Sequence, residues 1–176
     1  MATLTSSDQA RLGLVRPELM RALLHLLDAA AATLGVRCQV PDYGGTRSLA
    51  TQQELYEDSI AQGGGVLAYP VGKPGRSRHN YGAAVDLHIV AGGTNDNGTG
   101  SDDDYLQLAE VAESLGELTA GYFFAARGQG QSDPYHFQLA EPLETSIARW
   151  NAMASAGIGT TVALLIAGAL AVRALR

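Results

Sequence analysis

Cysteine is almost absent from this 176-residue sequence: Cys38 stands alone, which excludes an internal disulfide bond. Basic residues are also scarce, with 12 Lys and Arg against 18 Asp and Glu and a formal net charge of −6. A nucleic-acid-binding protein needs a basic face, so this balance argues against nucleic acid as a partner. Internal repeats and long blocks of like charge are missing too. What remains is a chain long enough for one hydrophobic core.

The two ends of the chain differ in character. Residues 1–9 are polar and lack a basic patch leading into an apolar run, so no cleaved secretory signal is predicted. Residues 152–172 contain no charged side chain, and Arg173 follows them. As a helix this segment would span about 31 Å, close to the ~30 Å hydrocarbon thickness of a bilayer. It predicts a transmembrane helix with a short basic tail at 173–176; the alternative is an apolar helix packed on the domain or on a second subunit.

Small residues recur every four positions in this hydrophobic segment, at Ser155, Gly159, Ala163, Ala167 and Ala171. In a helix they would share one face, and small-residue faces let helices approach closely in lipid. The segment is therefore expected to anchor the protein in a membrane and to self-associate. The competing interpretation is that alanine only makes the helix permissive and implies no partner.

Residues 1–140 are predicted to form one α+β domain, followed by a linker at 141–151. Apolar residues in 17–34 repeat with the helical period, which places Leu19, Leu23 and Leu26 on one buried stripe. Further helices are predicted at 49–62, with Ser48 as N-cap, and at 102–115. Short strands are predicted at 36–40, 83–90, 122–126 and 135–139, which gives a small, mostly antiparallel sheet with helices packed against it.

An acidic cluster at Asp102, Asp103 and Asp104 follows Ser101. Ser101 with Asp104 three residues later is typical of a capping box, and acidic residues in the first turn suit the helix dipole. The cluster therefore predicts the start of the helix at 102. Binding of a second cation by these aspartates is the alternative.

Two segments, 77–86 and 133–137, carry groups suited to metal chemistry. His79, Asp86 and His136 offer two imidazoles and a carboxylate, a set that can hold zinc and leave one position for water. Zinc lowers the pKa of bound water to about 7, and a second carboxylate is then needed to take the proton. Asp133 lies three residues before His136. Taken alone, these residues fit equally well with two hydrogen-bonded histidines and surface acids.

A resemblance to a known family favours the metal site. The run Ser-x-His-x-x-Gly-x-Ala-x-Asp, from Ser77 to Asp86, is followed far downstream by Asp-x-x-His-Phe, from Asp133 to Phe137. A third element, Gly-Thr-Arg-Ser at 45–48, precedes a helix that carries Gln52. In this order the three elements resemble the zinc D-Ala-D-Ala carboxypeptidase and L-alanyl-D-glutamate endopeptidase family, which includes VanY-type enzymes and phage endolysins. The resemblance covers residues 17–139.

The resemblance implies a role for each motif residue. It assigns the zinc ligands to His79, Asp86 and His136 and the general base to Asp133. It places Arg47 beside the substrate carbonyl or carboxylate. Ser77 and Gln52 are expected to contact substrate or to support the site.

The resemblance also implies the reaction, which is hydrolysis of an amide bond in the stem peptide of peptidoglycan. Cleavage between L-Ala and D-Glu, as in phage lysis enzymes, is the first expectation, and D-Ala-D-Ala carboxypeptidase activity is the alternative. A non-catalytic zinc module that binds the cell wall, or a structural membrane protein, is the alternative from another class. With the hydrophobic segment, the expected location is a membrane-anchored enzyme acting on the wall, in a bacterium, a phage lysis system or a membrane-containing virion.

Two positions depart from the family pattern. Many members carry tryptophan shortly before Asp-x-x-His and an acid just after His-Phe, whereas this chain has Gln131 and Ser132 before and Gln138 after. Neither position supplies a required ligand. We therefore expect the departures to change substrate preference more than the reaction.

Overall fold

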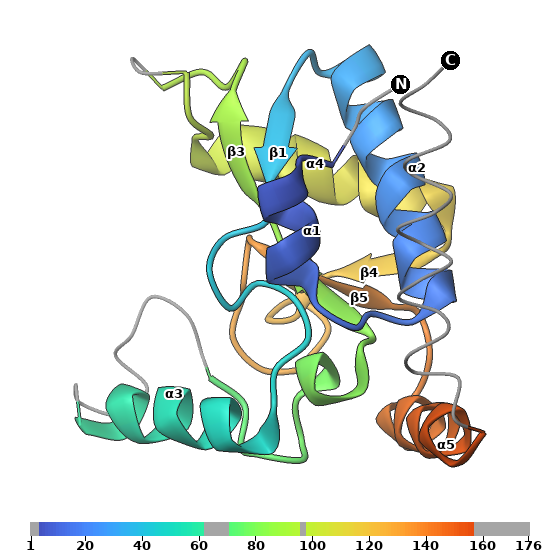
Figure 1. Cartoon of the computed structure of the whole chain (residues 1–176). Coiled ribbons are helices and arrows are strands. Elements are labelled where there is room, and N and C mark those ends of the chain that lie inside the picture. Colours follow the sequence, from blue (N-terminus) through green and yellow to red (C-terminus); the bar gives the residue numbers. More distant parts are fainter. Residues whose placement is uncertain (1–3, 62–70, 96–97, 157–176) are drawn as a thin grey trace.

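The computed structural model describes residues 4–61, 71–95 and 98–156 and has a mixed α+β fold with two small antiparallel sheets. Helix α2 crosses in front of α4, which it contacts, and α3 extends to one side of the domain (Figure 1). The helices are α1 (Ser6–Leu12), α2 (Pro17–Thr33), α3 (Leu49–Ala61), α4 (Asp102–Leu115) and α5 (Leu143–Ser155), with short 3-10 helices η1 (Arg78–Tyr81) and η2 (Gly121–Phe123).

Capping residues, a proline and a glycine mark where the helices begin and end. Helix α2 begins with Pro17 at its first turn and buries the predicted leucine stripe, and it ends just before Gly35, whose φ of 70° only glycine adopts readily. Ser101 and Asp104 form the predicted capping box of α4. The Thr51 amide donates to Ser48 Oγ at 3.0 Å, which confirms Ser48 as the start of α3. Helix α1 was not predicted, and a capping box of Thr5 and Asp8 begins it.

The larger sheet has the order β2-β5-β4, formed by β2 (Ala84–Asp86), β5 (His136–Leu139) and β4 (Leu118–Ala120). In its central pair Val85 lies opposite Phe137, and Asp86 lies opposite His136. Val85 and Phe137 are fully buried in the core. Because side chains alternate between the faces of a strand, Asp86 and His136 project together from the opposite face.

The predicted strand at 83–90 is two strands. β2 ends at Asp86, and β3 (His88–Ala91) pairs with β1 (Arg37–Gln39) in the second sheet. Between them the Leu87 amide donates to the carbonyl of Tyr135, and the Leu87 side chain is fully buried. The break therefore keeps Leu87 in the core while the chain passes from one sheet to the other.

The predicted strand at 122–126 is wrong. The strand lies earlier, at β4, and η2 with a following turn occupies the predicted positions. The aromatic run 122–124 favours a strand by propensity. Gly121, however, packs so closely on the Asp133 carbonyl that a Cβ there would be 2.6 Å from its oxygen. This close approach turns the chain out of the sheet.

The segment 141–151, predicted as a linker, contains most of helix α5, which packs on η1. Arg16 has no exposed surface, and its guanidinium forms an ion pair with Glu141. Ser146 Oγ on α5 donates to Glu141 Oε1 at 2.7 Å, and Arg149 lies 3.5 Å from Glu18. A buried charge needs such partners, so these contacts fix α5 against the start of α2.

Among residues 4–61, 71–95 and 98–156, no helix is long and apolar enough to cross a membrane. Only the first positions of the predicted span belong to this part of the chain, where α5 ends at Ser155. Residues 157–172, and with them most of the proposed anchor and its small-residue face, lie outside the described residues. The anchor and its self-association stay predictions.

The buried pair of Arg16 and Glu141 predicts a large effect on stability. Glu141→Gln in the full chain should lower the free energy of unfolding by about 3 kcal/mol, because it leaves the buried guanidinium of Arg16 without its closest anion. Urea unfolding measures this difference. Glu144→Gln, on an exposed position of the same helix, is the matched control and should change stability little. Equal unfolding midpoints for the two variants would show that the pair contributes nothing to folding.

Candidate metal centre

Three elements, η1, β2 and β5, bring His79, Asp86 and His136 together. His79 lies on η1, whose N-cap Ser77 accepts a hydrogen bond from the His79 amide. η1 ends at Gly82, which has a φ of 56° and approaches the Leu14 carbonyl too closely to allow a Cβ. Asp86 is the last residue of β2, and His136 is the first residue of β5.

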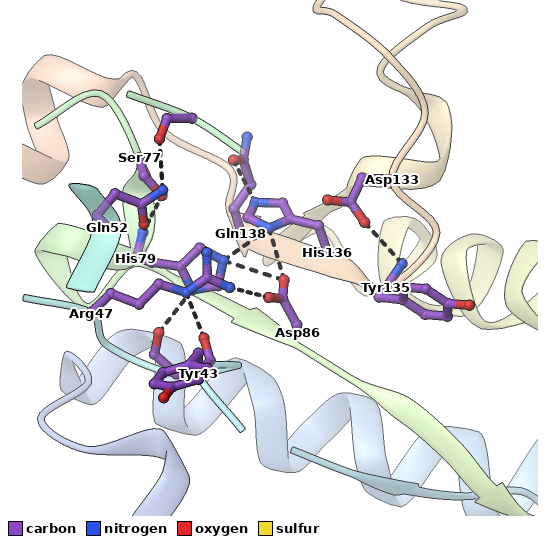
Figure 2. A network of polar contacts seen from close by, with 12 residues as sticks. Tyr43, Arg47, Gln52, Ser77, His79, Asp86, Asp133, Tyr135, His136 and Gln138 are labelled. Carbon is purple, nitrogen blue, oxygen red and sulfur yellow. Dashed lines mark hydrogen bonds and ion pairs between the residues drawn. The ribbon is translucent and has the colours of Figure 1, made fainter. Parts of the chain in front are cut away.

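The three side chains converge on one point (Figure 2). His79 Nε2 lies 3.2 Å from His136 Nδ1 and 3.3 Å from Asp86 Oδ1. His136 Nδ1 lies 3.1 Å from the same carboxylate oxygen. In a tetrahedral zinc site with bonds of about 2.0–2.1 Å, neighbouring ligand atoms are about 3.3–3.4 Å apart. The three separations are therefore close to those of a tetrahedral zinc site.

The hydrogen bond of His79 determines which nitrogen faces the centre. Its Nδ1 lies 2.8 Å from the Gly45 carbonyl oxygen, which can only accept, so the ring proton is on Nδ1. Nε2 then presents a lone pair toward Asp86 and His136. Among the described residues, this is the one group of His, Cys, Asp or Glu side chains that could hold a metal ion, with ligand atoms within 4.8 Å of one another.

Burial and charge tune the three groups. Burial lowers the pKa of His79, which favours the neutral form that binds metal. Burial raises the pKa of Asp86, but the neighbouring imidazoles of His79 and His136 hold it well below its usual range. Burial lowers the pKa of His136, yet the hydrogen bond and charge of Asp86 raise it above its ordinary value. The centre therefore has an ionised carboxylate, which a cation site requires.

Arg47 holds the second oxygen of the Asp86 carboxylate. Its Nη2 forms an ion pair with Asp86 Oδ2, and its Nε donates to the Tyr43 carbonyl at 2.5 Å. Tyr43 has a φ of 61°, an uncommon conformation for a residue other than glycine. Arg47 thereby orients Asp86 so that Oδ1 faces the two histidines. The resemblance predicted that Arg47 contacts substrate, and the structure shows that Arg47 also contacts Asp86.

The centre lies in a cleft of about 600 Å³, which is lined among others by Arg47, Ser77, Arg76, Asp133 and Gln138. Asp133 is partly buried, and its Oδ1 accepts a hydrogen bond from the Tyr135 amide at 3.3 Å. Burial raises the pKa of Asp133, and the charge of His136 partly offsets the effect. The predicted base therefore borders the same space as the predicted ligands.

Of the two weaker sequence candidates, Ser77 lines the cleft, while Gln52 is fully buried and is not among the lining residues. The Gln52 Nε2 donates to the Gly72 carbonyl at 2.7 Å, so this side chain supports the wall of the cleft from behind. Its predicted contact with substrate is untested.

Sequence reasoning missed Gln138, which it treated only as a departure from the family pattern. Its Oε1 lies 3.1 Å from His136 Nε2. Gln138 is two residues from His136 on the same strand, and this alternation is the signal that could have placed both on one face. His88, on β3, also lines the cleft, and its ring packs edge-on against Tyr135 at 4.8 Å between centroids.

The family of D-alanyl-D-alanine carboxypeptidases named VanY matches residues 13–140 of the chain. No curated protein sequence matches significantly. Among solved structures, the vancomycin-resistance D,D-pentapeptidase VanY of a VanB-type cassette, in complex with Zn(II), is similar with a TM-score of 0.55 and 21% identity over 78% of each chain. VanYB in complex with D-alanine-D-alanine gives a TM-score of 0.56 and 21% identity over 85% of this chain and 81% of that one.

A third similar structure, the L,D-carboxypeptidase DacB from Streptococcus pneumonia, gives a TM-score of 0.50 and 21% identity over 80% of this chain and 74% of that one. At this identity the structures support the fold, while the family match covers most of the chain and includes every predicted ligand. The chain therefore belongs to the VanY family of D-alanyl-D-alanine carboxypeptidases and is a zinc-dependent hydrolase of that family.

Proposed function

We propose that this protein is a carboxypeptidase that removes the C-terminal residue of a peptidoglycan stem peptide. The observation that carries the proposal is the convergence of His79, Asp86 and His136 in a cleft that Asp133 also borders. The family match and the D-Ala-D-Ala complex of VanYB favour a carboxypeptidase over the L-Ala-D-Glu endopeptidase that the sequence favoured.

In this proposal His79 Nε2, Asp86 Oδ1 and His136 Nδ1 hold the zinc ion. Bound zinc supplies a water molecule with a pKa near 7 and polarises the scissile carbonyl. The protein must then manage protons and charge around the reacting amide. Asp86 stays ionised beside the site because Arg47 and both histidines stabilise its charge.

Asp133 is proposed to move the proton. Its carboxylate takes a proton from water as the oxygen–carbon bond forms, and it returns that proton to the amide nitrogen as the carbon–nitrogen bond breaks. The products are a shortened peptide acid and a free amino acid, and no other reactant is needed. The Tyr135 amide donates to Asp133 Oδ1 and holds the carboxylate in place (Figure 2).

Arg47 is proposed to stabilise the charge that develops on the substrate carbonyl oxygen. A guanidinium has five N–H donors, and the contacts with Tyr43 and Asp86 use two of them. Arg47 also lines the cleft. A rigidly held cation of this kind acts on charge that appears in the transition state.

A carboxypeptidase must also bind the free carboxylate of its substrate, and we assign this contact to Arg76. Arg76 is exposed, lines the cleft and forms no ion pair with an acid in the described part of the chain. Arg47 and Arg78 also line the cleft, but Asp86 and Ser146 respectively contact their guanidinium groups. Arg76 is therefore the lining arginine best placed to accept a new anion.

Digestion of purified muropeptides, followed by mass spectrometry, tests the reaction. Release of one free D-alanine from pentapeptide stems supports the proposal. Release of intact peptide from L-alanine would identify the endopeptidase instead. Unchanged muropeptides with a zinc-loaded protein would favour the non-catalytic zinc module.

Loss of a ligand should remove the metal. His79→Ala and His136→Ala should each lose the zinc that the wild type retains after dialysis, and they should lose activity with it. Elemental analysis measures zinc per chain, with about one expected for the wild type. His25→Ala is the matched control because His25 is exposed on α2 and pairs with Glu117. Full zinc content in either ligand variant would refute the assigned site.

Removing the base should separate metal binding from catalysis. Asp133→Asn should retain zinc and lower kcat by on the order of 10²–10⁴, because an amide cannot accept the proton. Asp103→Asn, on an exposed position of α4, should leave kcat unchanged. Steady-state release of D-alanine measures both. Wild-type turnover by Asp133→Asn would show that another group is the base.

Arg76 should affect the KM of a peptide only when the peptide has a free C-terminal carboxylate. Arg76→Gln should raise KM about fivefold for a peptide with a free C-terminus, with little change in kcat, because an exposed ion pair is worth about 1 kcal/mol. The same peptide with an amidated C-terminus should show no further loss. Lys73→Gln, an exposed cation of the same loop that does not line the cleft, is the control. Equal KM values for Arg76→Gln and wild type would move the carboxylate contact elsewhere.

A further inference from the structure

Gln138 and His136 share one face of β5, while Phe137 between them is buried in the core. Across the sheet Gln138 lies opposite Ala84 on β2 and Thr119 on β4. These small neighbours leave room for the longer Gln138 side chain to reach toward the cleft, which it lines. Figure 2 shows its amide directed at the His136 ring.

The contact is between Gln138 Oε1 and His136 Nε2, at 3.1 Å. An amide oxygen only accepts hydrogen bonds, and a neutral imidazole carries one N–H. When a metal is bound at Nδ1, the His136 proton must lie on Nε2, which then donates to Gln138 Oε1. In the structure Nδ1 lies 3.1 Å from Asp86 Oδ1 and so already faces the centre. The opposite orientation of the amide would put the proton on Nδ1 and aim it into the centre.

His79 has the same arrangement with a different partner. Its Nδ1 donates to the backbone carbonyl of Gly45, so Nε2 faces the centre. Each histidine is thus held by a neutral oxygen acceptor, one from the backbone and one from a side chain. Only the side-chain acceptor can be altered by substitution without moving the backbone.

We infer that Gln138 is a positioning residue that fixes the tautomer and orientation of His136 so that Nδ1 binds the metal. The inference rests on the proposed zinc site. Gln138 itself contacts neither zinc nor substrate in this role. The neutral acceptor fixes the ring without adding negative charge to a centre that already holds Asp86. Partners of this kind typically change metal affinity 10–100-fold when they are removed.

Zinc affinity tests the inference without measuring activity. Gln138→Met keeps a side chain of similar length and removes the acceptor, and it should weaken zinc binding 10–100-fold in competition with a chelator. Gln138→Glu restores an acceptor oxygen and should bind zinc at least as tightly as the wild type. Gln107→Met, on an exposed position of α4, is the control for the substitution itself, and urea unfolding reports whether each variant folds.

The imidazole ¹⁵N spectrum provides the signature of the tautomer. The zinc-bound wild type should show a protonated Nε2 and a metal-bound Nδ1 at His136, and Gln138→Met should lose the single tautomer. Wild-type affinity and an unchanged spectrum in folded Gln138→Met would overturn the inference while leaving the zinc site intact. A wild-type protein that binds no zinc would overturn the proposed function and this inference together.

Discussion

The metal centre depends on the antiparallel pairing of β2 with β5. This register sets Asp86 opposite His136 and Val85 opposite Phe137. A slip of β5 by one residue would send His136 into the core and Phe137 into the cleft. The burial of Val85 and Phe137 therefore specifies the register. The hydrophobic core and the metal site are two faces of one strand pair.

The third ligand comes from outside the sheet, and the loop at 44–47 connects it to the strands. The Asp86 amide donates to the Gly44 carbonyl at 2.7 Å, and the Gly45 carbonyl accepts from His79. A Cβ at Gly45 would lie 2.3 Å from the Leu12 carbonyl oxygen, so the loop is packed tightly against the end of α1. Helix α1 thus supports the orientation of His79, although it is more than sixty residues away in sequence.

Helix α5 supports η1 from the other side. The Arg16 amide donates to the Gly82 carbonyl at 3.0 Å, while its guanidinium pairs with Glu141 just before α5. Trp150 on α5 packs so close to Gly82 that a side chain there would collide with its ring. The ligand His79 therefore sits on a turn clamped between the start of α2 and α5. A chain truncated near Trp150 would lack the last part of α5 and would therefore lose part of this support.

The sequence by itself predicted the proposed ligand set, through its resemblance to the family, and determined the main helices. His79, Asp86 and His136 stand at motif positions of that family, and the structure brings them together. Helical periodicity and capping are local patterns, so the bounds of α2 and α4 could be predicted. Tertiary contacts decided the rest. The aromatic run 122–124 left the sheet because Gly121 packs on Asp133, and the predicted linker became α5 because buried Arg16 needs Glu141. Arg47 contacts Asp86, which is distant in sequence, so this pairing exists only in the folded domain. Gln138 and His136 are neighbours on one strand face, but which face borders the cleft is decided only when burial of the core fixes the register.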